Sequence, residues 1–247
     1  MSPIAVIGVG LLGLFVGAAV WVVSRARATE RPLFAGPACA NSECGAGLPA
    51  LAWLPFYGFG AALTCGRCGA RQPLRRPLFE LAVAAYYAVA AARFEGRDLA
   101  AVLVFAVPLL LILLVDWWTR FIHTDVIGLG LIAGFGFAAA DGVRPFLSAL
   151  GATAGAVTVF VLFFVLAALI YRNVRVVPFG LGDVYLAAMI GAMTRTSNVV
   201  QALLTGVLLA GVGSILLLVT RRVGRRDAIP YGPFLCVGAL VALLFPI

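Results

Sequence analysis

The sequence predicts an all-α membrane protein, a polytopic bundle of about eight transmembrane helices with one loop large enough to fold separately. Its 247 residues are 63% hydrophobic and 11% charged, whereas charged residues make up about a quarter of a soluble domain. A helix that crosses a bilayer needs about 20 apolar residues, and apolar runs of about that size recur along the chain. This composition excludes an ordinary soluble enzyme.

The apolar runs divide the chain into three parts, which we expect to be a first transmembrane helix (1–23), a cysteine-rich loop (24–76) and a transmembrane bundle (77–247). The first run has no basic residues before it and is longer than a signal peptide needs, so we expect it to be retained. The sixth and eighth runs are short, which a protein-lined interior tolerates. The expected spans are 3–23, 77–93, 99–116, 126–141, 146–171, 183–194, 199–220 and 230–247.

The basic residues are all arginine, and their distribution predicts the orientation in the membrane. If the spans alternate, 14 of the 18 arginines fall on one side, in the segments 24–76, 117–125, 172–182 and 221–229. Arginine-rich connections stay in the cytoplasm. We therefore expect a multi-pass protein with its amino terminus outside and the cysteine-rich loop in the cytoplasm. Binding of nucleic acid is not needed to explain the net charge of +8.

Four of the five cysteines lie in this loop as two close pairs, Cys39 with Cys44 and Cys65 with Cys68. Two such pairs, separated by twenty residues, are typical of a tetrahedral thiolate site for zinc. Four thiolates leave no open coordination position, so the zinc would be structural. Two disulfides are the alternative, which a reducing compartment disfavours. Cys236 stands alone in the last span, where we expect a buried small side chain.

A glycine pattern near the amino terminus matches the dinucleotide-binding fingerprint, at Gly8, Gly10 and Gly13. That fingerprint requires a preceding strand, but here it lies inside a continuous apolar span. Small residues that let two helices pack closely explain it better.

Two aspartates lie at the ends of expected spans, where a charged group in a membrane bundle is costly and calls for a function. Asp116 ends an apolar run, and Asp183 begins the sixth span immediately after Gly180-Leu181-Gly182. Alternation of the spans places both at the cytoplasmic rim, at one depth. Two adjacent carboxylates share a proton, so one can activate water while the other polarises a carbonyl. Capping of the helices, or pairing with Arg120 and Arg175, is the alternative.

The surrounding motifs resemble those of the prepilin leader peptidases, which are intramembrane aspartyl proteases with a GxGD motif. Gly-Leu-Gly-Asp at 180–183 matches that motif, and Asp116 followed by Asp125 resembles the first aspartate motif of the family. The cysteine loop running into 76–81 and the tail at 229–234 resemble two further landmarks. The resemblance implies that Asp116 and Asp183 are catalytic, and that Gly180, Gly182 and Asp125 support them.

The resemblance also implies a substrate and a location. Prepilin or pseudopilin precursors for type IV pili or type II secretion would lose a basic leader at the cytoplasmic face of the bacterial inner membrane, in contact with membrane lipid. Some members also methylate the new amino terminus with S-adenosylmethionine. Tyr185 replaces a usual lysine and Thr124 a usual proline, and these two departures leave the protease chemistry intact. The segment Ser24-Arg25-Ala26-Arg27 departs from the sequence of longer members, so this second activity is left open.

A transporter is the alternative from another functional class. In a proton- or cation-coupled transporter, membrane carboxylates carry the ion. That function predicts acids near the midplane and inverted repeats, and the sequence shows neither.

Overall fold

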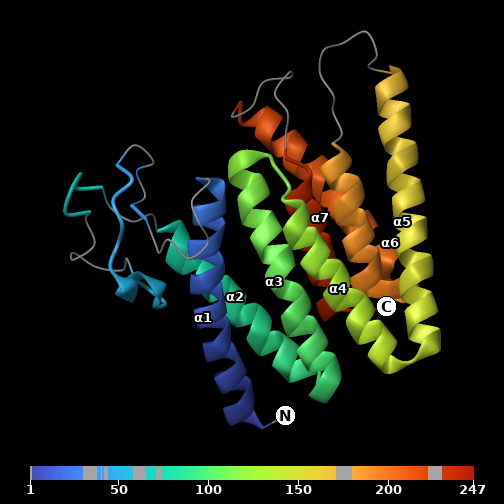
Figure 1. Ribbon diagram of the computed structural model, residues 1–247, viewed down its shortest axis with the longest axis horizontal. Coiled ribbons are helices and arrows are strands. Elements are labelled where there is room, and N and C mark those ends of the chain that lie inside the picture. Colours follow the sequence, from blue (N-terminus) through green and yellow to red (C-terminus); the bar gives the residue numbers. More distant parts are fainter. Residues whose placement is uncertain are drawn as a thin grey trace. The chain divides into compact units, whose positions relative to one another are not determined.

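The computed structural model describes residues 2–29, 38–39, 41, 44–57, 65–70, 74–170, 180–221 and 230–247. Within these ranges the regular elements are helices and there is no strand, apart from one isolated bridge between Ala38 and Gly47. The fold class is therefore all-α, as the composition predicted (Figure 1). The elements are α1 (Pro3–Ala28), the short 3-10 helix η1 (Ala50–Trp53), α2 (Arg75–Arg93), α3 (Gly96–Thr119), α4 (Thr124–Asp141), α5 (Val143–Ile170), α6 (Leu181–Val219) and α7 (Gly232–Leu244).

The chain forms two compact units, Met1–Leu103 and Val104–Ile247, so the boundary falls inside α3. In the first unit α1 packs along α2 through small residues. A Cβ added at Gly13 would lie 2.8 Å from the Ala84 Cα, and one at Gly17 would lie 3.0 Å from the Glu80 Cα. The glycine pattern of α1 therefore serves helix packing, and no strand precedes it in residues 2–29.

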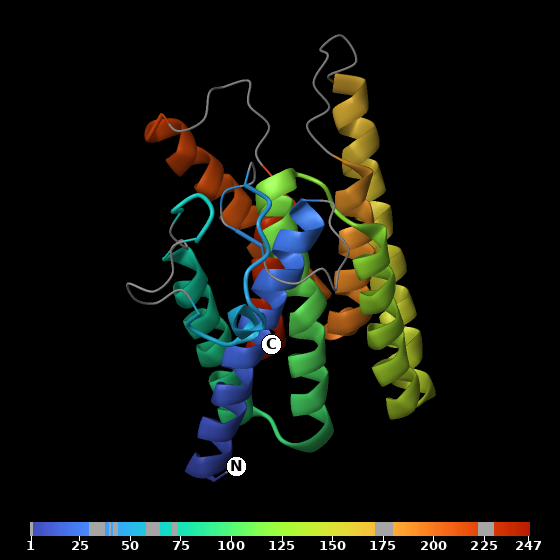
Figure 2. The ribbon, with the colours of Figure 1, turned by 60° about the vertical axis from the view of Figure 1, so that its left-hand side comes forward.

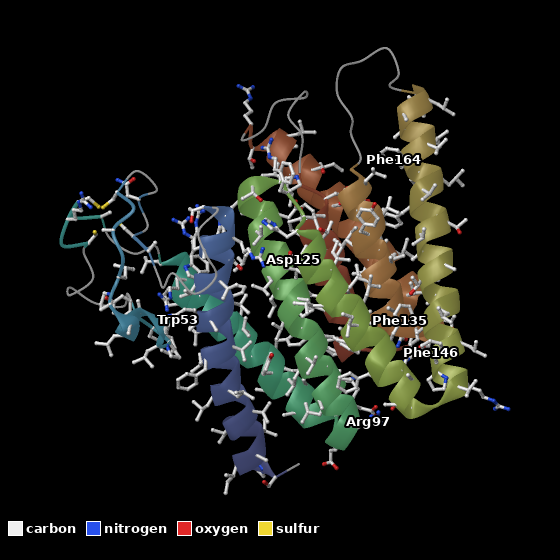
Figure 3. All side chains as sticks on the ribbon, in the orientation of Figure 1. Trp53, Arg97, Asp125, Phe135, Phe146 and Phe164 are labelled. Atoms are coloured by element: carbon white, nitrogen blue, oxygen red, sulfur yellow. The ribbon has the colours of Figure 1, made fainter. Side chains whose placement is uncertain are left out.

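In the second unit α5 lies beside both α4 and α6 (Figures 1 and 2). The rings of Phe135 and Phe146, which Figure 3 labels near the junction of α4 and α5, are 5.9 Å apart. The backbone of α6 approaches α5 so closely that a Cβ at Gly191 would lie 2.8 Å from the Ala152 carbonyl oxygen. Small residues again set the distance between helices.

Helix α6 is interrupted at Arg195, where φ is 58° and ψ is −176°. Beyond this residue α6 runs antiparallel to α7, because Gln201 donates to the Phe245 carbonyl at one end while Gly213 meets Phe234 at the other. Before it, α6 starts beside the first residue of α7, since the side chain of Ile122 contacts both Gly182 and Gly232. The chain therefore reverses direction at Arg195, whose guanidinium forms an ion pair with Asp141.

The expected number of eight spans is not confirmed. Five helices in the described residues are long and apolar enough to cross a membrane: α1, α3, α4, α5 and α6. The predicted runs 183–194 and 199–220 correspond to the two helical segments of α6, which meet at the non-helical residue Arg195. Helix α2 carries charged residues in its first turns, and α7 has only 13 residues. The apolar helices of the described residues indicate a multi-pass membrane protein, and the number of eight spans stays a prediction.

Candidate functional site

Asp116 lies in the last turn of α3 and is buried, with 4% of its surface exposed. The backbone N–H of Gly232, the first residue of α7, donates to its carboxylate. A Cβ placed on Gly232 would lie only 2.6 Å from the Asp116 Oδ2. No ion pair joins Asp116 to Arg120 in the described part of the chain, where Arg120 is exposed. The proposed partner Arg175 lies outside the described residues.

Asp183 lies in the first turn of α6 and is also buried, with 8% of its surface exposed. Its Oδ2 accepts a hydrogen bond from the backbone N–H of Gly180, at 3.2 Å. A carboxylate is favourable at this position, because the first N–H groups of a helix have no partner within it. A Cβ on Gly182 would lie 3.2 Å from Ile122, so this glycine permits a close approach of α6 to the segment that follows α3.

The structure brings the two aspartates into one electrostatic environment. The charge of Asp183 acts on Asp116, and Ile122 contacts the glycines beside both, Gly182 and Gly232. Cys236, completely buried on α7, lies within electrostatic range of both carboxylates. The sequence reasoning placed Cys236 in the core but missed its position beside this pair. Its spacing of four residues from Gly232, which puts both on one helical face, could have indicated it.

Asp125 occupies the first turn of α4 and is exposed, and Figure 3 labels it there. Its Oδ1 accepts from the backbone N–H of Val126 at 2.9 Å. His123 precedes α4, and its buried Nδ1 has no hydrogen-bond partner. Asp125 thus differs from Asp116 and Asp183 in exposure.

The four loop cysteines converge to a second candidate site, in the first unit. All four are free thiols, and their sulfur atoms lie within 4.8 Å of one another. The Sγ atoms of Cys39 and Cys68 are 3.5 Å apart, and those of Cys44 and Cys65 are 3.8 Å apart. Zinc–sulfur bonds of about 2.3 Å in a tetrahedron place the sulfurs about 3.8 Å apart. The cluster therefore has the donor set and the dimensions to hold zinc.

The backbone around each cysteine pair has the same construction. The N–H of Cys39 donates to the Ala46 carbonyl at 2.9 Å, and that of Cys65 donates to the Ala70 carbonyl at 2.9 Å. A glycine with positive φ follows each pair, Gly45 at 59° and Gly69 at 70°, a conformation that glycine adopts without steric cost. These turns direct the two sulfurs of each pair to the same side.

Backbone donors also favour the metal-binding form of one thiol. The N–H groups of Arg67 and Cys68 donate to the Cys65 sulfur and lower its pKa to about 6. Burial raises the pKa of Cys39 above its ordinary value. A metal ion binds the thiolate, so Cys65 is prepared for this role at neutral pH.

A buried ion pair connects the cysteine loop to α2, and the sequence reasoning did not find it. The Arg76 Nε donates to the Glu80 Oε1 at 2.8 Å, and the two side chains are 2% and 0% exposed. The Arg76 Nη2 donates to the carbonyls of Ala52 and Leu54, at 2.8 and 3.0 Å. The backbone N–H of Phe56 donates to the Glu80 Oε2 at 2.6 Å. The spacing of four residues between opposite charges was the only available indication.

Comparison with known proteins agrees with the sequence motifs. Residues 103–215 match the type IV leader peptidase family. A prepilin leader peptidase/N-methyltransferase of Bacillus subtilis (strain 168) is 28% identical over 184 residues, which cover 73% of this chain and 70% of that protein. No solved structure gives a significant match. The matched region contains Asp116 and Asp183, and the predicted resemblance is confirmed: this chain is similar to the type IV leader peptidases.

Proposed function

We propose that this chain is a membrane-embedded aspartic endopeptidase that removes the basic leader from type IV prepilin-like precursors. The observation that carries the proposal is that two buried carboxylates, Asp116 of α3 and Asp183 of α6, lie close enough for the charge of Asp183 to act on Asp116. The resemblance to the leader peptidases, and the printed name of the Bacillus relative, support the choice of substrate.

The chemistry requires the two carboxylates to share one proton. The ionised aspartate takes a proton from water as the water oxygen attacks the scissile carbonyl carbon. The protonated aspartate donates to the carbonyl oxygen. When the tetrahedral intermediate collapses, the C–N bond breaks, and the leaving amine receives the proton that the first aspartate took from water. A hydroxyl of the intermediate returns its proton to the second aspartate as the C=O bond of the new carboxyl group forms. Both carboxylates return to their starting states, so no external reactant besides water is consumed.

Gly180 and Gly182 would support this chemistry by holding the backbone close to the pair. Gly180 donates its N–H to Asp183, and Gly182 permits contact with Ile122. Asp125, which is exposed, fits a role toward the substrate rather than toward the attacking water.

We place the reaction at the cytoplasmic face of the bacterial inner membrane, with the amino terminus outside. The distribution of 14 arginines on one side supports this orientation. An apolar precursor helix can lie in the bilayer among the spans while its basic leader stays in water. The scissile bond, which joins the leader to the apolar helix, then lies at the membrane rim. Asp116, in the last turn of α3, and Asp183, in the first turn of α6, lie at the same level.

The test is cleavage of a model precursor with a basic leader, a glycine at the cut and a long apolar helix. Asp116→Asn and Asp183→Asn keep the side-chain shape and remove a shareable proton, so each should abolish cleavage. The double variant should be no worse than either single variant, because groups acting as a unit are not additive. Asp125→Asn should retain measurable activity.

Asp98→Asn is the matched control, since this carboxylate is exposed in the first turn of α3. It should cleave as the wild-type chain does. Wild-type turnover by either Asp116→Asn or Asp183→Asn would refute the aspartic mechanism. An inactive wild-type chain would refute the assignment of the substrate.

N-methylation is a second candidate activity, which the printed name of the Bacillus relative favours. S-adenosylmethionine would supply the methyl group. Transfer of a labelled methyl group to the cleaved product would establish this activity. Zinc in the cysteine cluster would be structural, since four sulfur ligands complete its coordination.

The transporter alternative finds less support in the structure. In the described residues the buried acids are Glu80, Asp116 and Asp183. Glu80 is engaged by Arg76, and the other two lie at helix ends in one unit. A series of carboxylates across the membrane, which would carry an ion, is absent from this part of the chain.

A further inference from the structure

Besides α3 and α6, which carry the two aspartates, helix α7 also contributes to this site. Its contact with Asp116 is made by a glycine, Gly232. A Cβ on Gly232 would lie 2.6 Å from the Asp116 Oδ2, 3.2 Å from its Cγ and 3.3 Å from the Ile122 Cδ1. Ordinary contacts begin at 3.4 Å, so any side chain at this position would displace the carboxylate or the helix. Gly232 itself is buried.

The N–H of Gly232 is free to serve the carboxylate because it belongs to the first turn of α7. The first four N–H groups of a helix have no partner within the helix, and here the next residue, Pro233, has no N–H to offer. The N–H of Gly232 donates to Asp116 instead. The positive end of the α7 dipole also favours a negative charge at this point. Asp183 receives the corresponding donation from Gly180.

We propose that Gly232 is a positioning residue for the reaction. Because Gly232 has no side chain, the amino end of α7 can contact Asp116 and hold its carboxylate in the orientation that activates water. The inference rests on the proposed peptidase function. It also distinguishes the two aspartates, since Asp116 is oriented by a separate helix and Asp183 by the residue that precedes its own helix.

Gly232→Ala tests the proposal. The added methyl group must be relieved by a shift of about 0.8 Å, and a misplacement of about 1 Å at a reacting group costs about 100-fold in rate. With the model precursor, kcat should fall by about 100-fold while KM stays within about twofold, because substrate binding does not involve the carboxylate orientation. Equal losses in kcat and binding, or an unchanged kcat, would overturn the proposal.

Two further variants separate positioning from general packing. Gly211→Ala, in the same unit, adds a methyl group to a helical glycine with nothing within 4 Å, and should keep wild-type kcat. Ile122→Val removes the Cδ1 atom that the new methyl group would also meet. If the double variant Gly232→Ala/Ile122→Val recovers wild-type kcat, the loss arose from crowding against Ile122, and the proposal fails.

A stability measurement keeps the proposal testable if Gly232→Ala folds poorly. Asp116→Ala removes both carboxylate atoms that the new methyl group would approach. Gly232→Ala should therefore lower the thermal midpoint in the wild-type chain and have little effect in the Asp116→Ala chain, a coupling expected of residues in contact. Equal effects in both chains would overturn the contact. An inactive wild-type chain would instead refute the proposed function while leaving this coupling measurable.

Discussion

Replacing Glu80 with leucine should destabilise the chain severely, because Glu80 belongs to a buried network. The substitution removes the partner of the Arg76 guanidinium, which is 2% exposed, and the acceptor of the Phe56 N–H. Removing one member of a buried ion pair costs about 3–5 kcal/mol, since the other charge remains unpaired. The two carbonyls that accept from Arg76, on Ala52 and Leu54, compensate only part of that charge.

Loss of Glu80 should also affect the loop segment that packs against α2. Phe56 has a φ of 57°, a strained conformation for a bulky residue, and its N–H is held by the Glu80 carboxylate. Loss of this acceptor should release the segment that carries η1 from α2. We therefore expect a lower free energy of unfolding together with faster proteolysis of the cysteine loop.

The assay is thermal or denaturant unfolding of the purified protein in detergent, with three matched variants. Glu80→Leu alone should lose about 3–5 kcal/mol. The double variant Arg76→Leu/Glu80→Leu should recover part of that loss, because no buried charge is then left unpaired. Arg75→Leu, at the exposed neighbouring position, should change stability by about 0.5 kcal/mol or less. A Glu80→Leu chain within about 1 kcal/mol of wild type, or a double variant with fully additive losses, would refute the reasoning.

Two other predictions concern the first unit. Metal analysis of the purified protein should give about one zinc per chain, and Cys65→Ser should abolish this binding, whereas Cys236→Ser should not; a chain that holds no metal contradicts the site. Gly13→Ala should lower stability by about 1–3 kcal/mol through overpacking, because its Cβ would lie 2.8 Å from α2. Gly8→Ala, with nothing within 4 Å, is its control in the same unfolding assay, and equal effects would argue against the packing role.

Local sequence patterns were sufficient to predict several features of this protein. The apolar runs indicated the all-α membrane class. The paired cysteines indicated a cluster, which the structure brings together within 4.8 Å. The positions of Asp116 and Asp183 at the ends of apolar runs indicated that both lie at helix termini, as they do. These features depend on periodicity, composition and short spacing, which are properties of neighbouring residues.

The number of eight spans stays a prediction, because hydropathy does not show whether a short helix such as α7, with 13 residues, crosses the membrane. Hydropathy did place a break between the runs 183–194 and 199–220, where the structure has one. The form of this break depends on the positive φ of Arg195 and on its ion pair with Asp141, 54 positions earlier in the chain. In the same way, the charges in the first turns of α2 looked like the border of a loop. They form a buried pair instead, because the loop folds over them.

Contacts between distant segments were decided only by the tertiary structure. Nothing in the local sequence around Gly232 shows that its absent side chain makes room for Asp116, because the two residues meet only when α7 packs against the end of α3. The sequence by itself determined which residues could form helices, bind a metal or carry charge in a membrane. Packing decided which of them meet, because close contact depends on the paths of whole helices rather than on any residue's neighbours.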